Sequence, residues 1–126
     1  MAWIYYNPNP YGKIVDDCTV RALCKLEGWG WLDSYMTLCI HGAMIGDLPN
    51  ANSVMRKVLE ERGYSRHIIP DTYPNCYTVA DFATDNQSNI CLACTGSHVI
   101  AVVDGDYYDT ADTGYEIPLY YYKKEN

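Results

Sequence analysis

The sequence predicts an α+β fold in which an N-terminal lobe of about three helices packs on a C-terminal antiparallel β-sheet. Apolar residues recur at helical spacing as far as Gly63, whereas β-branched and aromatic clusters separated by turn residues follow it. The chain has 126 residues, of which 48% are hydrophobic and 20% charged. This length and composition fit a single domain, 1–126, that buries its own core.

The first expected helix follows a segment without regular structure. Residues 7–12 read Asn-Pro-Asn-Pro-Tyr-Gly, a cluster that opposes both helix and strand, so we expect an irregular chain as far as residue 16. Asp16 and Asp17 stand where an N-cap carboxylate belongs, and Gly28 is expected to end the helix.

Two further helices are expected before Gly63, one over about residues 31–45 and one over about residues 52–63. The candidate N-caps are Asp33 or Ser34 for the former and Asn52 or Ser53 for the latter. The expected buried positions are Tyr35, Leu38, Cys39 and Ala43 in the former and Val54, Val58 and Leu59 in the latter.

The second half of the chain carries the expected strands, because β-branched and aromatic residues cluster there between turn residues. Thr78 stands where it would cap a short helix over residues 78–83. Asp104-Gly105 is typical of a two-residue hairpin loop. The expected strands cover residues 64–69, 89–94, 98–103, 106–109 and 119–122.

Charge and hydropathy argue against several classes of function. Nine basic and 16 acidic residues give a net charge of −7, and an acidic chain offers no basic surface to nucleic acid or to an anionic membrane. No run of ~18 uncharged apolar residues is present, and the N-terminal residues lack the basic and apolar regions of a secretory signal. We therefore expect a cytoplasmic protein with mostly reduced cysteines and without nucleic-acid or membrane partners.

The six cysteines occupy different kinds of position. If the segment around them is a strand, Cys91 and Cys94 point to opposite faces and could not both bind one metal ion without a bulge. A redox pair normally lies at a helix start, so we expect both to be small strand hydrophobes, with a zinc or redox protein built on this pair as a third alternative. Cys24 and Cys39 fall on apolar helix faces. Cys18 lies in the first turn of a helix, where free backbone amides and the helix dipole stabilise a thiolate. Neither a metal nor an organic cofactor is implied.

A cysteine nucleophile needs a histidine base, and the chain offers His41, His67 and His98. His41 falls inside a helix and His67 in an early strand, whereas His98 opens the strand that leads into the predicted hairpin. With a two-residue loop, alternation places Asp109 on the same face as His98, as a diagonal neighbour, and Asp112 on the other face. We therefore expect Asp109 to orient the His98 ring and to fix its tautomer.

This order of residues resembles that of the papain-like cysteine peptidases. Three stretches carry the resemblance: Asp-Cys-Thr-Val-Arg-Ala-Leu at 17–23 after the Asn-Pro-Asn-Pro-Tyr-Gly segment, His-Val-Ile-Ala-Val-Val-Asp-Gly at 98–105, and Tyr-Asp at 108–109. More narrowly, they resemble small papain-like proteins of phages and Gram-positive bacteria. The resemblance implies a helical lobe that carries the nucleophile Cys18 against an antiparallel sheet that carries the base His98.

The chain departs from that family at the oxyanion hole. Papain-like enzymes usually carry a glutamine shortly before the nucleophile, and this chain has Gly12 there. We expect Asn7 or Asn9 to supply an amide donor in its place, together with the backbone amide of Cys18. Arg21, one turn after Cys18, is expected to pair with a carboxylate such as Asp17.

Together these residues predict a cysteine hydrolase, which could be a peptidase, an isopeptidase or an amidase, acting on a peptide or protein substrate. Cys18 would attack the carbonyl, His98 would transfer the proton and Asp109 would orient His98, with a thioester as the intermediate. The alternative is a catalytically inactive papain-like fold that acts as a protein-binding module. The 13 tyrosines, several of them in strand segments, would then form its binding surface.

Overall fold

The computed structural model describes residues 2–125, which form four helices and one six-stranded sheet. The helices are α1 (Cys18–Glu27), α2 (Trp31–Ile45), α3 (Asn52–Glu61) and α4 (Val79–Asp85). The strands are β1 (Trp3–Tyr5), β2 (Tyr64–Ile68), β3 (Ile90–Cys94), β4 (Val99–Val103), β5 (Asp106–Asp109) and β6 (Tyr120–Lys124). The predicted α+β class is thereby confirmed.

The sheet is mixed, not antiparallel as the sequence predicts. Its strand order is β1-β5-β4-β3-β6-β2, and β1 runs parallel to β5 while the other neighbours are antiparallel. The difference comes from β1, which lies in the segment expected to be irregular. Three residues before a proline-rich cluster are too few to show the alternation of apolar and polar side chains that indicates a strand. β1 forms because it pairs with β5, which comes about 100 residues later in the chain.

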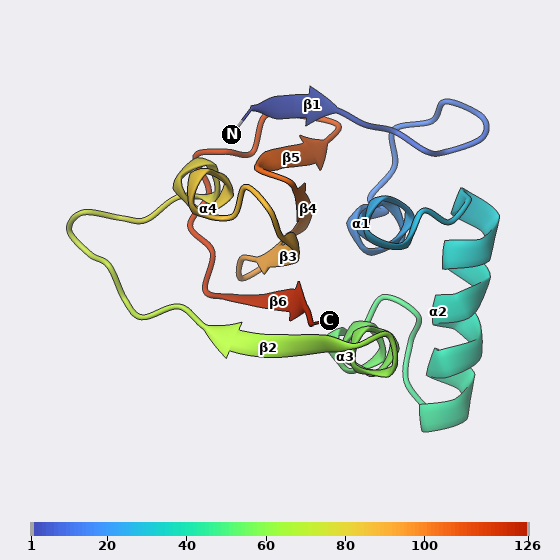
Figure 1. The fold of residues 1–126 in the computed structure, drawn as a ribbon. Helices are drawn as coiled ribbons and strands as arrows, with labels where there is room; N and C mark the ends of the chain where they lie inside the picture. The colour runs from blue at the N-terminus through green and yellow to red at the C-terminus, as the bar shows by residue number, and fades with distance from the viewer. Residues whose placement is uncertain (1, 126) are drawn as a thin grey trace.

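The helices cover the two faces of the sheet unequally (Figure 1). On one face α1 and α3 pack on the sheet, and α2 lies outside them in contact with both. On the opposite face α4 lies alone. Leu23, Leu59 and Leu92 belong to the core on the α1 side, whereas Phe82 and Val102 belong to the core on the α4 side.

Most helix boundaries agree with the sequence, but most of the predicted caps do not. Thr78 caps α4, with Asp81 completing a reciprocal capping box, as predicted for this threonine. Asp17 occupies the N-cap position of α1 but makes no capping hydrogen bond with its side chain. The N-caps of α2 and α3 are Gly30 and Ala51, so the candidates at 33–34 and 52–53 are wrong.

The predicted buried face of α2 is also wrong in part. Leu38 is buried as expected, but Tyr35 and Ala43 are exposed and Cys39 is partly exposed. The buried positions are Ser34, Leu38 and Gly42, four residues apart. Because α2 is apolar on nearly every side, its pattern does not identify the face that packs on α1 and α3. At 15 residues α2 is the longest helix, and no helix within residues 2–125 has the length and apolar character needed to cross a membrane.

Candidate active site

Cys18 and His98 come together where α1 begins and β4 begins. Cys18 is the first residue of α1, and His98 directly precedes β4. Both line a pocket of about 180 Å³ between the helices and the sheet. The other residues that line it are mostly polar: Asp16, Thr19, Asn50, Asn52, Thr95, Gly96, Ser97, Val99 and Tyr120.

The hairpin between β4 and β5 brings Asp109 to His98. Val103 pairs with Asp106, so the loop has two residues and the predicted register is confirmed. Both loop residues have positive φ, 52° at Asp104 and 87° at Gly105, as a type I′ turn requires. In this register His98 Nε2 lies 2.7 Å from Asp109 Oδ2.

The neighbouring carboxylate, Asp112, has a different partner. The Tyr107 hydroxyl donates to Asp112 Oδ1 at 2.8 Å, and the backbone amide of Gly114 donates to the same oxygen at 3.0 Å. The other two histidines are also engaged elsewhere. His41 bonds to Glu61 at 2.9 Å and His67 to Ser65 at 2.9 Å, and neither lines the pocket that holds Cys18.

Asp109 is buried and accepts four hydrogen bonds with its side chain. Besides the contact with His98, Oδ2 accepts from the Thr113 hydroxyl at 2.8 Å. Oδ1 accepts from Arg21 Nη2 at 3.0 Å and from the Thr110 backbone amide at 2.8 Å. Burial raises the pKa of Asp109, but the bonds from His98 and Thr113 outweigh it, so the pKa lies below the ordinary value. Asp109 is therefore an ionised carboxylate whose orientation is fixed by hydrogen bonds to both of its oxygens.

Arg21 links the helical lobe to this carboxylate. Its guanidinium is buried, and it pairs with Asp17 as predicted and with Asp109, which the sequence does not predict. Trp31 Nε1 donates to the second oxygen of Asp17 at 2.9 Å. A single chain of polar contacts thus joins α2, the start of α1 and the end of β5.

The charges of Cys18 and His98 follow from these contacts. Burial raises the pKa of the Cys18 thiol, but hydrogen bonds from the His98 ring, the Val99 backbone amide and the Thr19 hydroxyl outweigh it, so the pKa is lowered. The hydrogen bond to Asp109 and then the one to Cys18 raise the pKa of His98 to about 10. Since Nε2 of His98 binds Asp109, Nδ1 is the nitrogen left for Cys18. Both shifts favour a thiolate beside a protonated imidazole.

The buried cysteines have the opposite character. Burial raises the pKa of Cys91 to about 11 and that of Cys94 to about 12, and it also raises the pKa of Cys24. Cys91 belongs to the core on the α4 side of the sheet and Cys94 to the core on the α1 side, as alternation predicts. Among residues 2–125 no group of three or more His, Cys, Asp or Glu side chains could hold a metal ion.

The structure does not bring Asn7 or Asn9 to the nucleophile. Asn7 Nδ2 donates to the backbone oxygen of Lys13 at 3.2 Å, and Asn9 Oδ1 accepts from the Tyr11 amide at 2.9 Å. Their amides organise the loop before α1, and neither asparagine lines the pocket. This part of the prediction is wrong, because asparagines in such a loop bond to the nearby backbone instead of reaching outward.

Two other asparagines line the pocket, Asn50 and Asn52. The sequence indicates Asn52 only as a candidate helix cap and gives Asn50 no role. They lie where the loop after α2 meets the start of α3. No sequence signal places them near Cys18, since this proximity comes from the packing of α1, α2 and α3 and not from their spacing along the chain.

Comparison with known proteins finds no match to a family model, to a curated protein or to a solved structure.

Proposed function

We propose that this protein is a cysteine hydrolase with a papain-like arrangement of Cys18, His98 and Asp109. One observation carries the proposal: the cysteine at the start of α1 shares a pocket with His98, whose ring is held at 2.7 Å by the buried carboxylate of Asp109. The lowered pKa of Cys18 and the raised pKa of His98 agree with this arrangement. A thiolate paired with imidazolium is the reactive state of a nucleophilic cysteine. The six unpaired cysteines support a reducing, cytoplasmic setting for this chemistry.

In the acylation step, the Cys18 sulfur attacks the carbonyl carbon of an amide bond and the carbonyl π electrons move to oxygen. When the oxyanion collapses, the C–N bond breaks, and the departing amine takes the proton from Nδ1 of His98. The products are a free amine, a thioester on Cys18 and a neutral His98. Asp109 holds the ring by Nε2 throughout, so that Nδ1 continues to face the sulfur.

In the deacylation step, neutral His98 removes a proton from water as the water oxygen attacks the thioester carbonyl. Collapse of this second oxyanion breaks the C–S bond and releases the carboxylic acid. The thiolate of Cys18 and the protonated ring of His98 are restored, so the cycle consumes one amide and one water. Any amide, isopeptide or peptide carbonyl that reaches the sulfur can follow this path.

The developing oxyanion needs hydrogen-bond donors. Cys18 is the first residue of α1, and the Asp17 side chain does not cap the helix, so we assign one donor to a backbone amide of the first turn, which that side chain leaves free. We place the second donor at the side-chain amide of Asn50 or Asn52, which line the same pocket. Loss of one such donor typically costs about 3 kcal/mol of transition-state stabilisation.

The test compares Cys18 with a cysteine that is more accessible but lacks a base. Cys76 is exposed whereas Cys18 is partly exposed, which makes Cys76 the internal control. Alkylation by iodoacetamide near neutral pH, followed by mass spectrometry, should modify Cys18 faster than Cys76, and cleavage of fluorescein-labelled casein should disappear in Cys18→Ala. Faster reaction at Cys76, or casein cleavage that persists in Cys18→Ala, would contradict the proposal.

A second candidate function is that of a catalytically inactive binding module. It is favoured by a row of exposed apolar side chains on the outer face of α2, spaced four residues apart: Leu32, Met36, Ile40 and Met44. Exposed apolar rows of this kind mark interaction sites on soluble proteins. The same alkylation measurement separates the two functions, because a binding module has no need of a cysteine that outreacts Cys76.

A further inference from the structure

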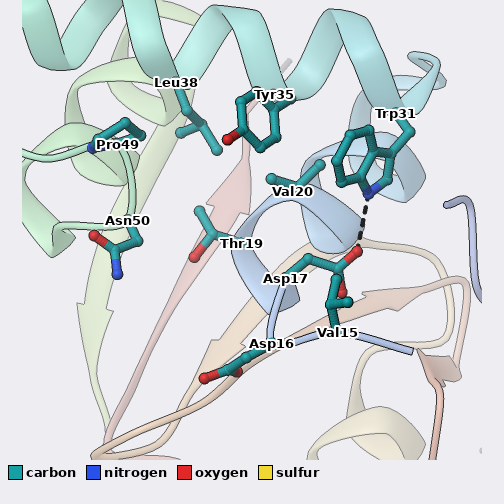
Figure 2. A pocket seen from close by; sticks show the side chains of 10 residues that line it. All are labelled: Val15, Asp16, Asp17, Thr19, Val20, Trp31, Tyr35, Leu38, Pro49 and Asn50. Carbon is teal, nitrogen blue, oxygen red and sulfur yellow. Dashed lines mark hydrogen bonds between the residues drawn. The ribbon is translucent and has the colours of Figure 1, made fainter. Parts of the chain in front are cut away.

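Asp17 directly precedes the nucleophile in the chain, and a carboxylate beside a thiolate opposes its ionisation by repulsion. Two donors compensate for the charge of Asp17. Arg21 pairs with one carboxylate oxygen, and the Trp31 indole donates to the other at 2.9 Å (Figure 2). The side chains of Asp17 and Arg21 are only 7% and 6% exposed. Solvent therefore does little to screen this charge, and the two donors supply most of the compensation.

The indole reaches Asp17 from a different helix. Trp31 is the first residue of α2, whereas Asp17 is the N-cap residue of α1. Figure 2 shows the nitrogen of the indole directed at the carboxylate across the space between the two helices. Among the residues that the structure describes, no other donor bonds to that oxygen. Without the indole N–H, one oxygen of a buried carboxylate would lose its hydrogen bond, which is costly for a charged group.

The Arg21 guanidinium connects Asp17 to the triad. Arg21 donates to Asp17 from Nη1 and to Asp109 from Nη2, and Nη2 lies 3.0 Å from Asp109 Oδ1. Asp109 holds His98 through its other oxygen. Because one buried guanidinium is shared between two carboxylates, a change in its bond to one carboxylate alters its bond to the other. Loss of the indole donor would draw the guanidinium towards Asp17 and weaken its hold on Asp109.

We propose that Trp31 is a positioning residue of this site and acts through Asp17 and Arg21. It keeps the Asp109 carboxylate in its orientation, and it limits the uncompensated negative charge beside Cys18. Trp31 does not line the pocket that holds Cys18, so its effect on the sulfur passes through the other side chains. The inference rests on the proposed hydrolase function and adds to it a residue of α2, a helix that carries no member of the triad.

Loss of the indole N–H should make the nucleophile less reactive at low pH. The charge of Asp17 would be less compensated and would repel the Cys18 thiolate more strongly. The weaker hold on Asp109 would also weaken the ion pair between His98 and the thiolate. Both changes raise the pKa of Cys18. Below that pKa, the rate of alkylation falls tenfold for each unit by which the pKa rises.

The test is the rate of Cys18 alkylation by iodoacetamide as a function of pH in Trp31→Phe, with circular dichroism and urea unfolding to show that the variant is folded. The rate near pH 6 should fall by roughly threefold or more, which corresponds to about half a pKa unit. At a pH above the pKa of Cys18 in both proteins, the two rates should be equal. An unchanged pH profile, or a rate lowered equally at every pH, would overturn the inference, because altered access to the sulfur does not depend on pH.

Two further variants show whether the N–H itself is responsible. Trp29→Phe is the matched control, since Trp29 is also partly exposed and its ring faces the Arg62 guanidinium at 5.2 Å, away from the triad. It should leave the pH profile unchanged. Replacing Trp31 by benzothienylalanine keeps the shape of the ring but puts sulfur in place of the N–H, and it should reproduce the effect of Trp31→Phe. Equal slowing in the Trp29 variant, or a wild-type profile with benzothienylalanine, would contradict the role of the indole N–H.

The unmodified chain separates this inference from the proposed function. If Cys18 outreacts Cys76 with iodoacetamide but the Trp31 variants keep the wild-type pH profile, only the positioning role of Trp31 is lost. If Cys18 does not outreact Cys76, the hydrolase function is lost and the positioning role with it.

Discussion

Replacing Asp109 by asparagine changes one atom of the site and leaves its size unchanged. The side chain accepts at Oδ1 from Arg21 and the Thr110 amide, and at Oδ2 from His98 and Thr113. Arg21 and the Thr110 amide can only donate, so the new NH2 group must take the Oδ2 position. The Thr113 hydroxyl can rotate to accept from it, but His98 must then accept at Nε2 and carry its proton on Nδ1. This is the wrong tautomer for a base that faces Cys18.

The size of the effect follows from the bonds that change. Hydrogen bonds to charged groups contribute about 1.5–3 kcal/mol each and are about twice as strong as neutral ones. Asp109→Asn converts the Arg21 bond into a neutral-acceptor bond and loses the charged His98 bond, so we expect the free energy of unfolding to fall by about 2–4 kcal/mol. For the reaction, a wrong histidine tautomer in a triad costs on the order of 10⁴ in kcat.

The assay is the rate of Cys18 alkylation by iodoacetamide as a function of pH, with urea unfolding to show that the variant is folded. Without the carboxylate the pKa of His98 falls and that of Cys18 rises, so alkylation near pH 6 should slow by roughly tenfold for each pKa unit that Cys18 regains. Asp112→Asn is the matched control, since that carboxylate bonds to Tyr107 and not to His98. An unchanged pH profile in folded Asp109→Asn would refute the tautomer argument.

Three further predictions concern charge, pH and packing. Arg21→Met leaves the buried carboxylates of Asp17 and Asp109 without their cation. The free energy of unfolding, measured by urea titration, should fall by about 3–5 kcal/mol. A loss below about 1 kcal/mol would contradict the buried pairing. The hydrolysis rate should increase with pH as Cys18 ionises, at a pKa below the usual 9.0. It should decrease again as His98 deprotonates near its raised pKa of about 10. A decrease in rate near the ordinary histidine pKa of 6.5 would show that Asp109 does not act on His98. Gly42→Ala should lower the Tm in calorimetry, because the new Cβ would lie 2.7 Å from the Asp47 carbonyl oxygen. In a helix without such a contact, alanine in place of glycine normally stabilises by about 1 kcal/mol. A higher Tm would therefore mean that the loop carrying Asp47 moves to make room for the Cβ.

The parts of the site that the sequence predicts are those set by local rules. Asp104-Gly105 specifies a two-residue hairpin, and the hairpin register places Asp109 and not Asp112 beside His98. Gly28 takes the left-handed conformation that ends α1, φ 70°, and Cys18 begins that helix as its position after the breaker segment predicts. Each of these relationships spans a short stretch of chain, so residue type and alternation are sufficient.

The parts that the sequence does not predict depend on contacts between distant segments. Arg21 and Asp109 are 88 residues apart, and nothing in the spacing of either one points to the other. Packing between distant segments likewise pairs β1 with β5 and places Asn50 and Asn52 at the pocket. The buried face of α2 is missed for a different reason, because apolar residues lie on nearly every side of this helix and its periodic signal is weak.

The parallel pairing of β1 with β5 has a consequence for the order in which the site is made. The Trp3 indole and the Tyr6 amide both donate to the backbone oxygen of Asp109, and Trp3 and Asp109 are 106 residues apart. At roughly 5–20 residues per second, the ribosome needs on the order of ten seconds to cover that distance. Until His98 and Asp109 have been added to the chain, Cys18 has neither its base nor the carboxylate that holds the base. The nascent chain therefore carries an ordinary thiol, and its nucleophile arises only when the last strands close the sheet.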